Sequence, residues 1–436
     1  MPILSTPWYY GWNIVAVAVG YQAIIFGIAI YSFTFWVPHW EEEFGVGRGD
    51  VMLVFLGLQA GMAVLSPFAG RAADTLSIRF LVALGAICFS LGLLASSYAG
   101  ALWQIGLSFT VLTVIGVLLA GPITAQTLVT RWFDRNSGLA MGVVTTGTSI
   151  GGLLMPLLMV YLQSRFGWRE ANVWLAALVV LFIVPASLLI YDSPAKAEVV
   201  AQDTKVSTSE RNSRSADVEW GLSGILKAPS FWTMMFCFTV VTAIFVAIQQ
   251  NMAPLAKDHG ISAVTVSYAV ALMASVMILA KLLFGFLADR TNLGILYAIA
   301  LASLAAALAI LIVTELRYST LLAIAALVGL ATGSVAPLLA AMIRRDFGIV
   351  SFGRVRGLSV SVLSCSAIGP WIAGSTFDAT GSYDVAWLVL GSLMIPAAIA
   401  SLYLSGTAEA KPQNANVPVG KKTIFSSVVR LLNRKQ

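Results

Sequence analysis

Residues 263–290 read AVTVSYAVALMASVMILAKLLFGFLADR, and this stretch decides the fold. Before its last two residues it holds one charge, Lys281, in an apolar run long enough to cross roughly 30 Å of hydrocarbon as a helix. About twelve such runs occur in the chain, and no Asp or Glu lies at comparable depth in any of them. A charge inside a bilayer is disfavoured by at least about 2.5–3.5 kcal/mol and marks a functional site by default. We therefore predict that Lys281 binds an anion.

The composition indicates the same class of protein. Of the 436 residues, 58% are hydrophobic and 11% are charged, whereas soluble domains carry about 25% charged residues. The strands of a β-barrel would alternate polar and apolar residues over about ten positions, and these runs do not. The sequence predicts an all-α polytopic membrane protein, with twelve transmembrane helices in two six-helix pseudo-symmetric bundles. The first run lacks a basic leader and a cleavage site, so we expect a retained helix.

The hydropathy pattern also sets the domain organisation. Residues 192–229 mix charged and small polar residues, which predicts a mobile cytoplasmic linker. An N-terminal bundle (1–191) precedes it, and a C-terminal bundle (230–405) and a basic cytoplasmic tail (406–436) follow. We place the spans at 13–38, 50–71, 80–99, 102–129, 138–163, 170–191, 230–252, 263–288, 293–314, 318–342, 356–377 and 384–405.

The distribution of basic residues predicts the orientation. With both termini in the cytoplasm, twenty of the 26 Lys and Arg residues fall in cytoplasmic segments and five in outer loops. This asymmetry is the positive-inside pattern of a multi-pass protein of the plasma (inner) membrane. It also explains the net charge of +6, so a nucleic-acid partner is not needed. We expect a monomer in the lipid bilayer, with no cofactor and no metal.

The two predicted halves repeat one another. The segment Gly70-Arg-Ala-Ala-Asp74 ends the second span, and Gly285-Phe-Leu-Ala-Asp289-Arg290 ends the eighth. Basic clusters that contain Arg131 and Arg345 follow spans four and ten. Repeated halves around a central site are typical of secondary transporters.

These repeated loops are candidate gates. A glycine there would let a neighbouring helix approach closely. An Asp can accept from helix N-terminal amides, and an Arg can pair with carboxylates or helix C-termini of the adjacent bundle. The alternative interpretation is that the charges are ordinary positive-inside loop charges. The predicted gating residues are Gly70, Asp74, Arg79, Gly285, Asp289, Arg290, Arg131 and Arg345.

With these motifs the chain resembles the major facilitator superfamily, and within it the branch of monocarboxylate transporters and oxalate–formate exchangers. The resemblance covers nearly the whole chain. Further matching pieces are Gly11-Trp12, Tyr31-Ser-Phe-Thr34, Arg131-Trp-Phe-Asp-Arg135, Gly138-Leu-Ala-Met-Gly142, Gly167-Trp-Arg169, Asp346-Phe-Gly348, Gly369-Pro370, Phe377-Asp378 and Gly381-Ser-Tyr383.

The resemblance gives Lys281 a role. Four residues before the motif glycine, these transporters carry an arginine that grips the substrate carboxylate; Lys281 keeps that charge but lacks the planar fork. Met277 stands where the monocarboxylate carriers place an Asp for proton coupling, so their proton mechanism does not carry over directly. Oxalate exchangers add a second cation in span eleven, where this chain has the uncharged residues 361–366, including Ser364. One cation suits one carboxylate.

Other polar residues are candidates for the substrate site. Tyr31 matches a span-one tyrosine that faces substrate in the oxalate branch. Gln126 and Gln249 lie in spans four and seven, which line the cavity in the resembling fold. For Lys281 the alternative is snorkelling toward the interface, and for the others it is helix packing or interhelical hydrogen bonding. The predicted substrate-binding residues are Lys281, Tyr31, Gln126, Gln249 and Ser364.

No enzyme constellation occurs in the sequence. Nucleotide-binding loops, paired carboxylates and metal-binding spacings are missing, and the two histidines, His39 and His259, lie at helix ends. We predict a secondary active transporter for a small organic anion, a monocarboxylate, coupled to a proton. The alternatives are an exchanger of carboxylates, an efflux facilitator for drugs or amphiphiles, and a membrane sensor. A small-residue face on span five is interpreted as helix packing: Gly142, Gly147, Gly151 and Gly152.

Overall fold

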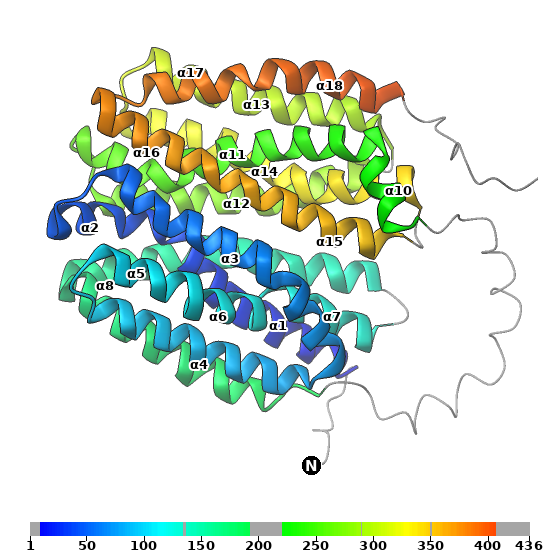
Figure 1. The fold of residues 1–436 in the computed structure, drawn as a ribbon, viewed down its shortest axis with the longest axis horizontal. Helices are drawn as coiled ribbons and strands as arrows, with labels where there is room; N and C mark the ends of the chain where they lie inside the picture. The colour runs from blue at the N-terminus through cyan, green and yellow to red at the C-terminus, as the bar shows by residue number, and fades with distance from the viewer. Residues whose placement is uncertain (1–8, 134–136, 192–219, 289, 349–350, 407–436) are drawn as a thin grey trace, which may run out of the picture.

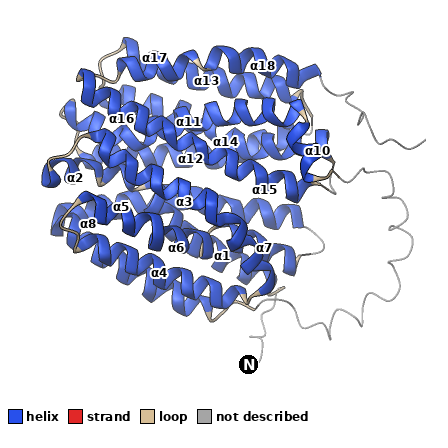
Figure 2. Ribbon diagram, in the orientation of Figure 1, coloured by secondary structure: helices blue, strands red, loops and turns tan. Residues whose placement is uncertain are grey.

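The computed structural model describes residues 9–133, 137–191, 220–288, 290–348 and 351–406, and the regular structure within these ranges is helical (Figure 2). Eleven of the described helices are long and apolar enough to cross a membrane. One of them, α8 (Ser137–Ser187), has 51 residues and is broken at Gly167, where φ is +80°. A residue with positive φ cannot continue a right-handed helix, so Gly167 divides α8 into two helices, and each of them supplies one span. The prediction of twelve spans is thus confirmed.

The first half of the chain forms one group of helices, coloured blue to teal in Figure 1. Its core is built from long apolar helices that bury one face against each other and leave the other face to lipid. Its elements are α1 (Gly11–Phe26), η1 (Gly27–Tyr31), η2 (Phe33–Phe35), α2 (Val37–Phe44), α3 (Arg48–Thr75), α4 (Ile78–Ser97), α5 (Leu102–Ser108), η3 (Phe109–Thr113), α6 (Val114–Leu119), α7 (Pro122–Trp132) and α8.

The second half forms the other group, coloured green to orange in Figure 1. Its elements are α10 (Leu222–Lys227), α11 (Pro229–Asp258), α12 (Ala263–Ala288), α13 (Leu293–Val313), α14 (Tyr318–Phe347), α15 (Phe352–Leu363), η5 (Ser364–Ala367), α16 (Ile368–Thr380), α17 (Asp384–Ser392) and α18 (Met394–Gly406).

The two halves meet along a seam on which α12 packs against α8 and α16 packs against α3. The helices run roughly parallel, so the molecule has two ends (Figure 1). We call the end that carries α2 and the α16–α17 turn the α2 end, and the end that carries α10 the α10 end.

Small residues bring α1 and α8 into backbone contact. A Cβ atom added at Gly27 would lie 2.6 Å from the Gly151 carbonyl oxygen, and one at Gly151 would clash with the Ala23 carbonyl oxygen. Close approach of this kind is how membrane helices gain packing energy without a hydrophobic driving force. At Gly142 an added Cβ would meet nothing within 4 Å. The predicted small-residue face therefore packs at its middle and not at its start.

Part of the predicted linker is folded. Residues 192–219 lie outside the described residues, but the rest of the segment holds α10, whose Ile225 is fully buried. The Trp220 backbone N–H donates to Ser351 Oγ at 2.8 Å, and its ring meets Phe347 edge-on at 5.3 Å. Because Trp220 and Ile225 supply apolar surface, the described end of this segment docks on the second half.

Candidate functional site

Lys281 reaches from the second half of the molecule to the first. Its Nζ donates to Ser149 Oγ at 2.7 Å, to the Thr145 carbonyl oxygen at 3.3 Å and to Thr148 Oγ1 at 3.4 Å. All three acceptors lie on α8, across the seam from α12, and Ser149 is fully buried. The ammonium is therefore held across the seam, which is not the geometry of a lysine that snorkels along its own helix.

The partners of Lys281 are all neutral. Among the described residues, no Asp or Glu forms an ion pair with it. Hydroxyl and carbonyl oxygens satisfy its hydrogen bonds but leave its charge uncompensated. In a low-dielectric seam such a charge attracts an anion much more strongly than it would in water.

Tyr31 lies in the same cluster. Its hydroxyl donates to Met277 Sδ at 3.6 Å, and Met277 is one turn before Lys281 on α12. A Cβ atom at Gly152 would lie 2.8 Å from the Tyr31 ring, so the ring packs directly on the α8 backbone. Tyr31 ends η1, a single π-helical turn, and such turns are frequent at functional sites. We call Lys281, Tyr31, Met277, Thr148 and Ser149 the Lys281 cluster.

Gln249 adjoins this cluster but is already engaged. Its Nε2 donates to the Ile30 carbonyl oxygen at 3.1 Å, and Gln250 Nε2 donates to the same oxygen at 3.0 Å. Both side chains are fully buried. In this conformation they join α11 to η1, as the interhelical alternative expected, one residue away from Tyr31.

Two predicted substrate residues make no hydrogen bond to Lys281 among the described contacts. Gln126 is half-buried on α7, and the hydrogen bonds of Lys281 do not include it. The hydroxyl of Ser364, the first residue of η5, donates to the Val360 carbonyl oxygen of the preceding helix α15 at 3.0 Å. Helical periodicity alone could not show toward which neighbour these side chains turn.

The predicted gating loop of the first half is held by Arg131. Its Nη2 donates to the backbone carbonyl oxygens of Ala73 and Asp74, the last turn of α3. An arginine there satisfies orphan carbonyls and complements the helix dipole. The Asp74 side chain is exposed. A Cβ at Gly70 would meet nothing within 4 Å, so no neighbouring helix approaches Gly70 closely in this conformation, and its role in gating stays a prediction.

The other predicted gating residues make local contacts. A Cβ added at Gly285 would lie at an ordinary 3.9 Å from Pro337 Cβ, so no helix presses on Gly285 in this conformation, and its role in gating also stays a prediction. Arg290 lies over the Phe286 ring of its own segment, 3.8 Å from the centroid, and Arg345 Nε pairs with the adjacent Asp346 at 2.7 Å. Arg79 is half-buried at the start of α4. Asp289 lies outside the described residues.

Arg131→Ala is expected to lower the free energy of unfolding by about 1–2 kcal/mol, because two α3 carbonyls lose a charged donor. Thermal unfolding of the purified protein measures this, and equilibrium binding of substrate should stay unchanged. The matched control is Arg79→Ala, since no hydrogen bond of Arg79 occurs among the described contacts. An equal loss of stability in both variants would contradict this role for Arg131.

The sequence interpretation missed the strongest polar cluster, which lies at the α2 end. Arg48 is one of the five basic residues that the predicted topology assigns to outer loops, yet its side chain is only 7% exposed. It binds both oxygens of Asp258 at 2.7 Å and donates to Glu41 at 2.8 Å. The predicted topology could have indicated this cluster, because it places Arg48, Glu41 and Asp258 on the same side of the membrane.

Comparisons with known proteins agree with this fold. The family model described as Major Facilitator Superfamily matches residues 18–314 and 251–435. Mouse monocarboxylate transporter 11 is 26% identical over 88% of this chain and 85% of its own length. Human monocarboxylate transporter 2 is 23% identical, covering 89% and 84%, and the uncharacterized MFS-type transporter YcxA of Bacillus subtilis is 25% identical, covering 81% and 85%.

The solved structures include a bacterial homologue of the human lysosomal transporter Spinster, in an inward-facing and occupied conformation. It superposes with a TM-score of 0.71 at 15% identity, over 94% of this chain and all of that one. The family model, the twelve spans and the shared architecture cover nearly the whole chain. The protein therefore belongs to the major facilitator superfamily and is a membrane transporter, not an enzyme.

Proposed function

We propose that this transporter moves a small organic monocarboxylate and that Lys281 binds the carboxylate. The observation that supports this most is the position of the ammonium, at the seam between the halves and among neutral partners. Membrane transporters of this construction bind substrate where their repeats meet. The relatives named monocarboxylate transporters favour the same substrate class.

The neighbours of Lys281 suit a carboxylate. A carboxylate accepts hydrogen bonds only, at about four lone-pair sites. Besides the ammonium, the cluster holds the hydroxyls of Thr148, Ser149 and Tyr31. Thr148 now donates to the Thr145 carbonyl oxygen and Tyr31 to Met277 Sδ, so these two would turn to a carboxylate when it binds. One cation with three hydroxyls fits one carboxylate better than two, since a second carboxylate would lack a counter-charge.

Lys281 also connects substrate binding to movement of the halves. Its α8 partners belong to the opposite half, so a substrate bound between them would touch both. An anion there would compensate the buried charge and favour closure of the seam around the substrate. A ligand changes a conformational equilibrium only by binding one state better, and this charge compensation supplies such a preference.

The coupling proposal rests on charge balance. Moving one charge across the membrane involves about 2.3 kcal/mol per 100 mV, so a negative-inside cell expels a lone monocarboxylate. Uptake therefore needs a proton or an exchanged anion. Met277 cannot carry a proton, but Lys281 can, and a bound carboxylate favours its charged form. We propose proton–monocarboxylate symport through Lys281.

Proteoliposomes test the coupling. With an inward proton gradient and no anion in the lumen, at least one labelled monocarboxylate of a panel is expected to accumulate. A protonophore should abolish the accumulation. Uptake that appears only after preloading with another carboxylate would show exchange instead. Transport of amphipathic cations with no carboxylate uptake would contradict the proposed substrate class.

The orientation is part of the proposal. We place the α10 end and both termini in the cytoplasm, because the cytoplasmic segments of this topology carry the excess of Lys and Arg. The α2 end, with Glu41, Glu42 and Glu43, then faces outward in the plasma (inner) membrane.

A further inference from the structure

Arg48 is the centre of a charge network at the α2 end. It is the first residue of α3, and its guanidinium binds both carboxylate oxygens of Asp258, at the end of α11, at 2.7 Å. The exposed fractions of the two side chains are 7% and 31%. Paired N–H···O bonds in this planar geometry are among the strongest ion-pair contacts in proteins. Here they join the first half of the chain to the second.

A second carboxylate binds the backbone at the same place. Asp378, on α16, accepts from the N–H of Arg48 at 2.9 Å and from the N–H of Gly49 at 2.7 Å. These are orphan amides of the α3 N-terminus, which an N-cap residue of the same helix normally satisfies. Gly47, which holds the N-cap position, has no side chain to do so. The cap of α3 is thus supplied by the opposite half.

The two backbones approach closely around this cap. A Cβ atom at Gly374 of α16 would lie 2.9 Å from the Arg48 carbonyl carbon, and one at Gly49 would lie 2.6 Å from Ser375 Oγ. Such contacts exist only while α3 and α16 are pressed together. The polar network therefore reports a closed seam at this end.

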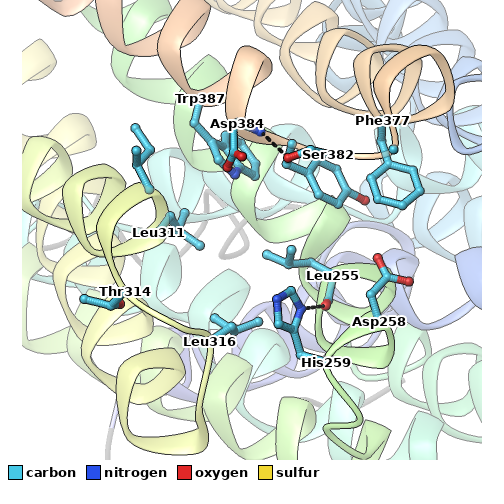
Figure 3. A pocket seen from close by; sticks show the side chains of 13 residues that line it. Leu255, Asp258, His259, Leu311, Thr314, Leu316, Phe377, Ser382, Asp384 and Trp387 are labelled. Carbon is cyan, nitrogen blue, oxygen red and sulfur yellow. Dashed lines mark hydrogen bonds between the residues drawn. The ribbon is translucent and has the colours of Figure 1, made fainter.

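Aromatic rings complete the contact. The Arg48 guanidinium lies 3.7 Å from the centroid of Phe377, and its Nη1 donates to the Tyr383 hydroxyl at 2.8 Å. Asp258, Phe377 and Tyr383 also line a cavity of about 370 Å³ (Figure 3). Three of the groups that contact Arg48 thus border open volume, so they can move without repacking a solid core.

Glu41 is the partner that stays with Arg48. It lies on α2, in the same half, and accepts from Arg48 Nε at 2.8 Å. Burial raises the pKa of Glu41, although Arg48 beside it acts to lower that pKa. This ion pair lies within one half, so opening of the seam does not require it to break. Separation of the halves would therefore not leave Arg48 without a carboxylate.

In alternating access, one repeat moves against the other around the substrate site, so each end of the seam must open in turn. We propose that Arg48, Asp258 and Asp378 form a latch that holds the α2 end closed and is released when this end opens. The latch is independent of the substrate: it joins the halves at the α2 end, and none of its residues belongs to the Lys281 cluster.

Cysteine accessibility tests the latch. Thr34 is fully buried, and its Oγ1 accepts from the Ala253 N–H across the seam at 2.9 Å. A Thr34→Cys reporter would be placed in a background with Cys88, Cys237 and Cys365 replaced by alanine. In lipid nanodiscs, where both ends are accessible, a water-soluble maleimide should label it slowly. Arg48→Gln, Asp258→Asn or Asp378→Asn should each raise the labelling rate at least about tenfold.

The control uses a salt bridge at the same end that does not join the halves. Arg169 pairs with Glu43 within the first half, with exposed fractions of 36% and 38%, so Arg169→Gln should leave the labelling rate unchanged. The double variant Arg48→Gln/Asp258→Asn should label no faster than Arg48→Gln, because both changes remove one interaction. Parental labelling rates in Asp258→Asn and Asp378→Asn would overturn the latch, as would equal acceleration by Arg169→Gln. Asp258→Asn and Asp378→Asn test the latch even if Arg48→Gln does not fold.

Discussion

Lys281→Ala is expected to reduce substrate uptake at least about a hundredfold, while the protein still inserts and purifies. Removing one partner of a desolvated charge pair costs about 2–5 kcal/mol, and a hundredfold loss corresponds to about 2.7 kcal/mol. The truncated side chain would leave the substrate carboxylate unpaired at the seam. The measurement is the initial rate of uptake into proteoliposomes, normalised to the amount of reconstituted protein.

Lys281→Arg is the matched control, because it restores the residue that is usual at this position in the resembling branch and keeps the charge. It should retain measurable uptake, although Ser149 Oγ, 2.7 Å from Nζ, leaves little room for the larger group. Near-parental uptake by the alanine variant would show that the substrate does not depend on this ammonium.

Gly151→Ala is expected to produce a large loss of stability. An added Cβ would clash with the Ala23 carbonyl oxygen and would lie 3.0 Å from the Gly27 nitrogen. Backbone atoms cannot rotate away as side chains can, so α1 and α8 would have to separate. Overpacking typically costs about 1–3 kcal/mol, and the upper part of this range is expected. The thermal midpoint of the purified protein in detergent measures it.

Gly142→Ala is the control on the same helix. There the added methyl group meets nothing within 4 Å, and alanine is favoured over glycine in a helix by about 0.5–1 kcal/mol. Its thermal midpoint should be unchanged or higher. Equal losses in the two variants would contradict the interpretation that backbone contact between α1 and α8 makes glycine necessary.

The sequence was sufficient to predict the architecture because each span can be recognised from its own residues alone. A run of about twenty apolar residues must cross the membrane as a helix, whatever its neighbours are. The same reasoning identified Lys281, since a charge in such a run is visible without knowing the fold. The resemblance added Tyr31, which lies one hydrogen bond from Met277.

The rest depended on contacts between distant parts of the chain. Arg48 is separated in sequence from Asp258 by 210 residues and from Asp378 by 330 residues. No local sequence pattern predicts partners at such separations. Gln249 lies next to the cluster, but its amide donates to the Ile30 carbonyl oxygen. The sequence could not predict this, because the periodicity of a helix that is apolar all round does not show which face turns toward which neighbour. For Gly70 and Gly285 the sequence shows the motif, but in this conformation no helix approaches either glycine closely.

Equilibrium binding tests the central claim most directly. The carboxylate that gives the highest uptake and its uncharged amide would be titrated into the purified protein and into Lys281→Gln, which keeps a hydrogen-bonding side chain without charge. The parental protein should bind the carboxylate at least about tenfold more tightly than the amide, and Lys281→Gln should lose this preference. Unchanged discrimination between carboxylate and amide in Lys281→Gln would show that another group recognises the anion.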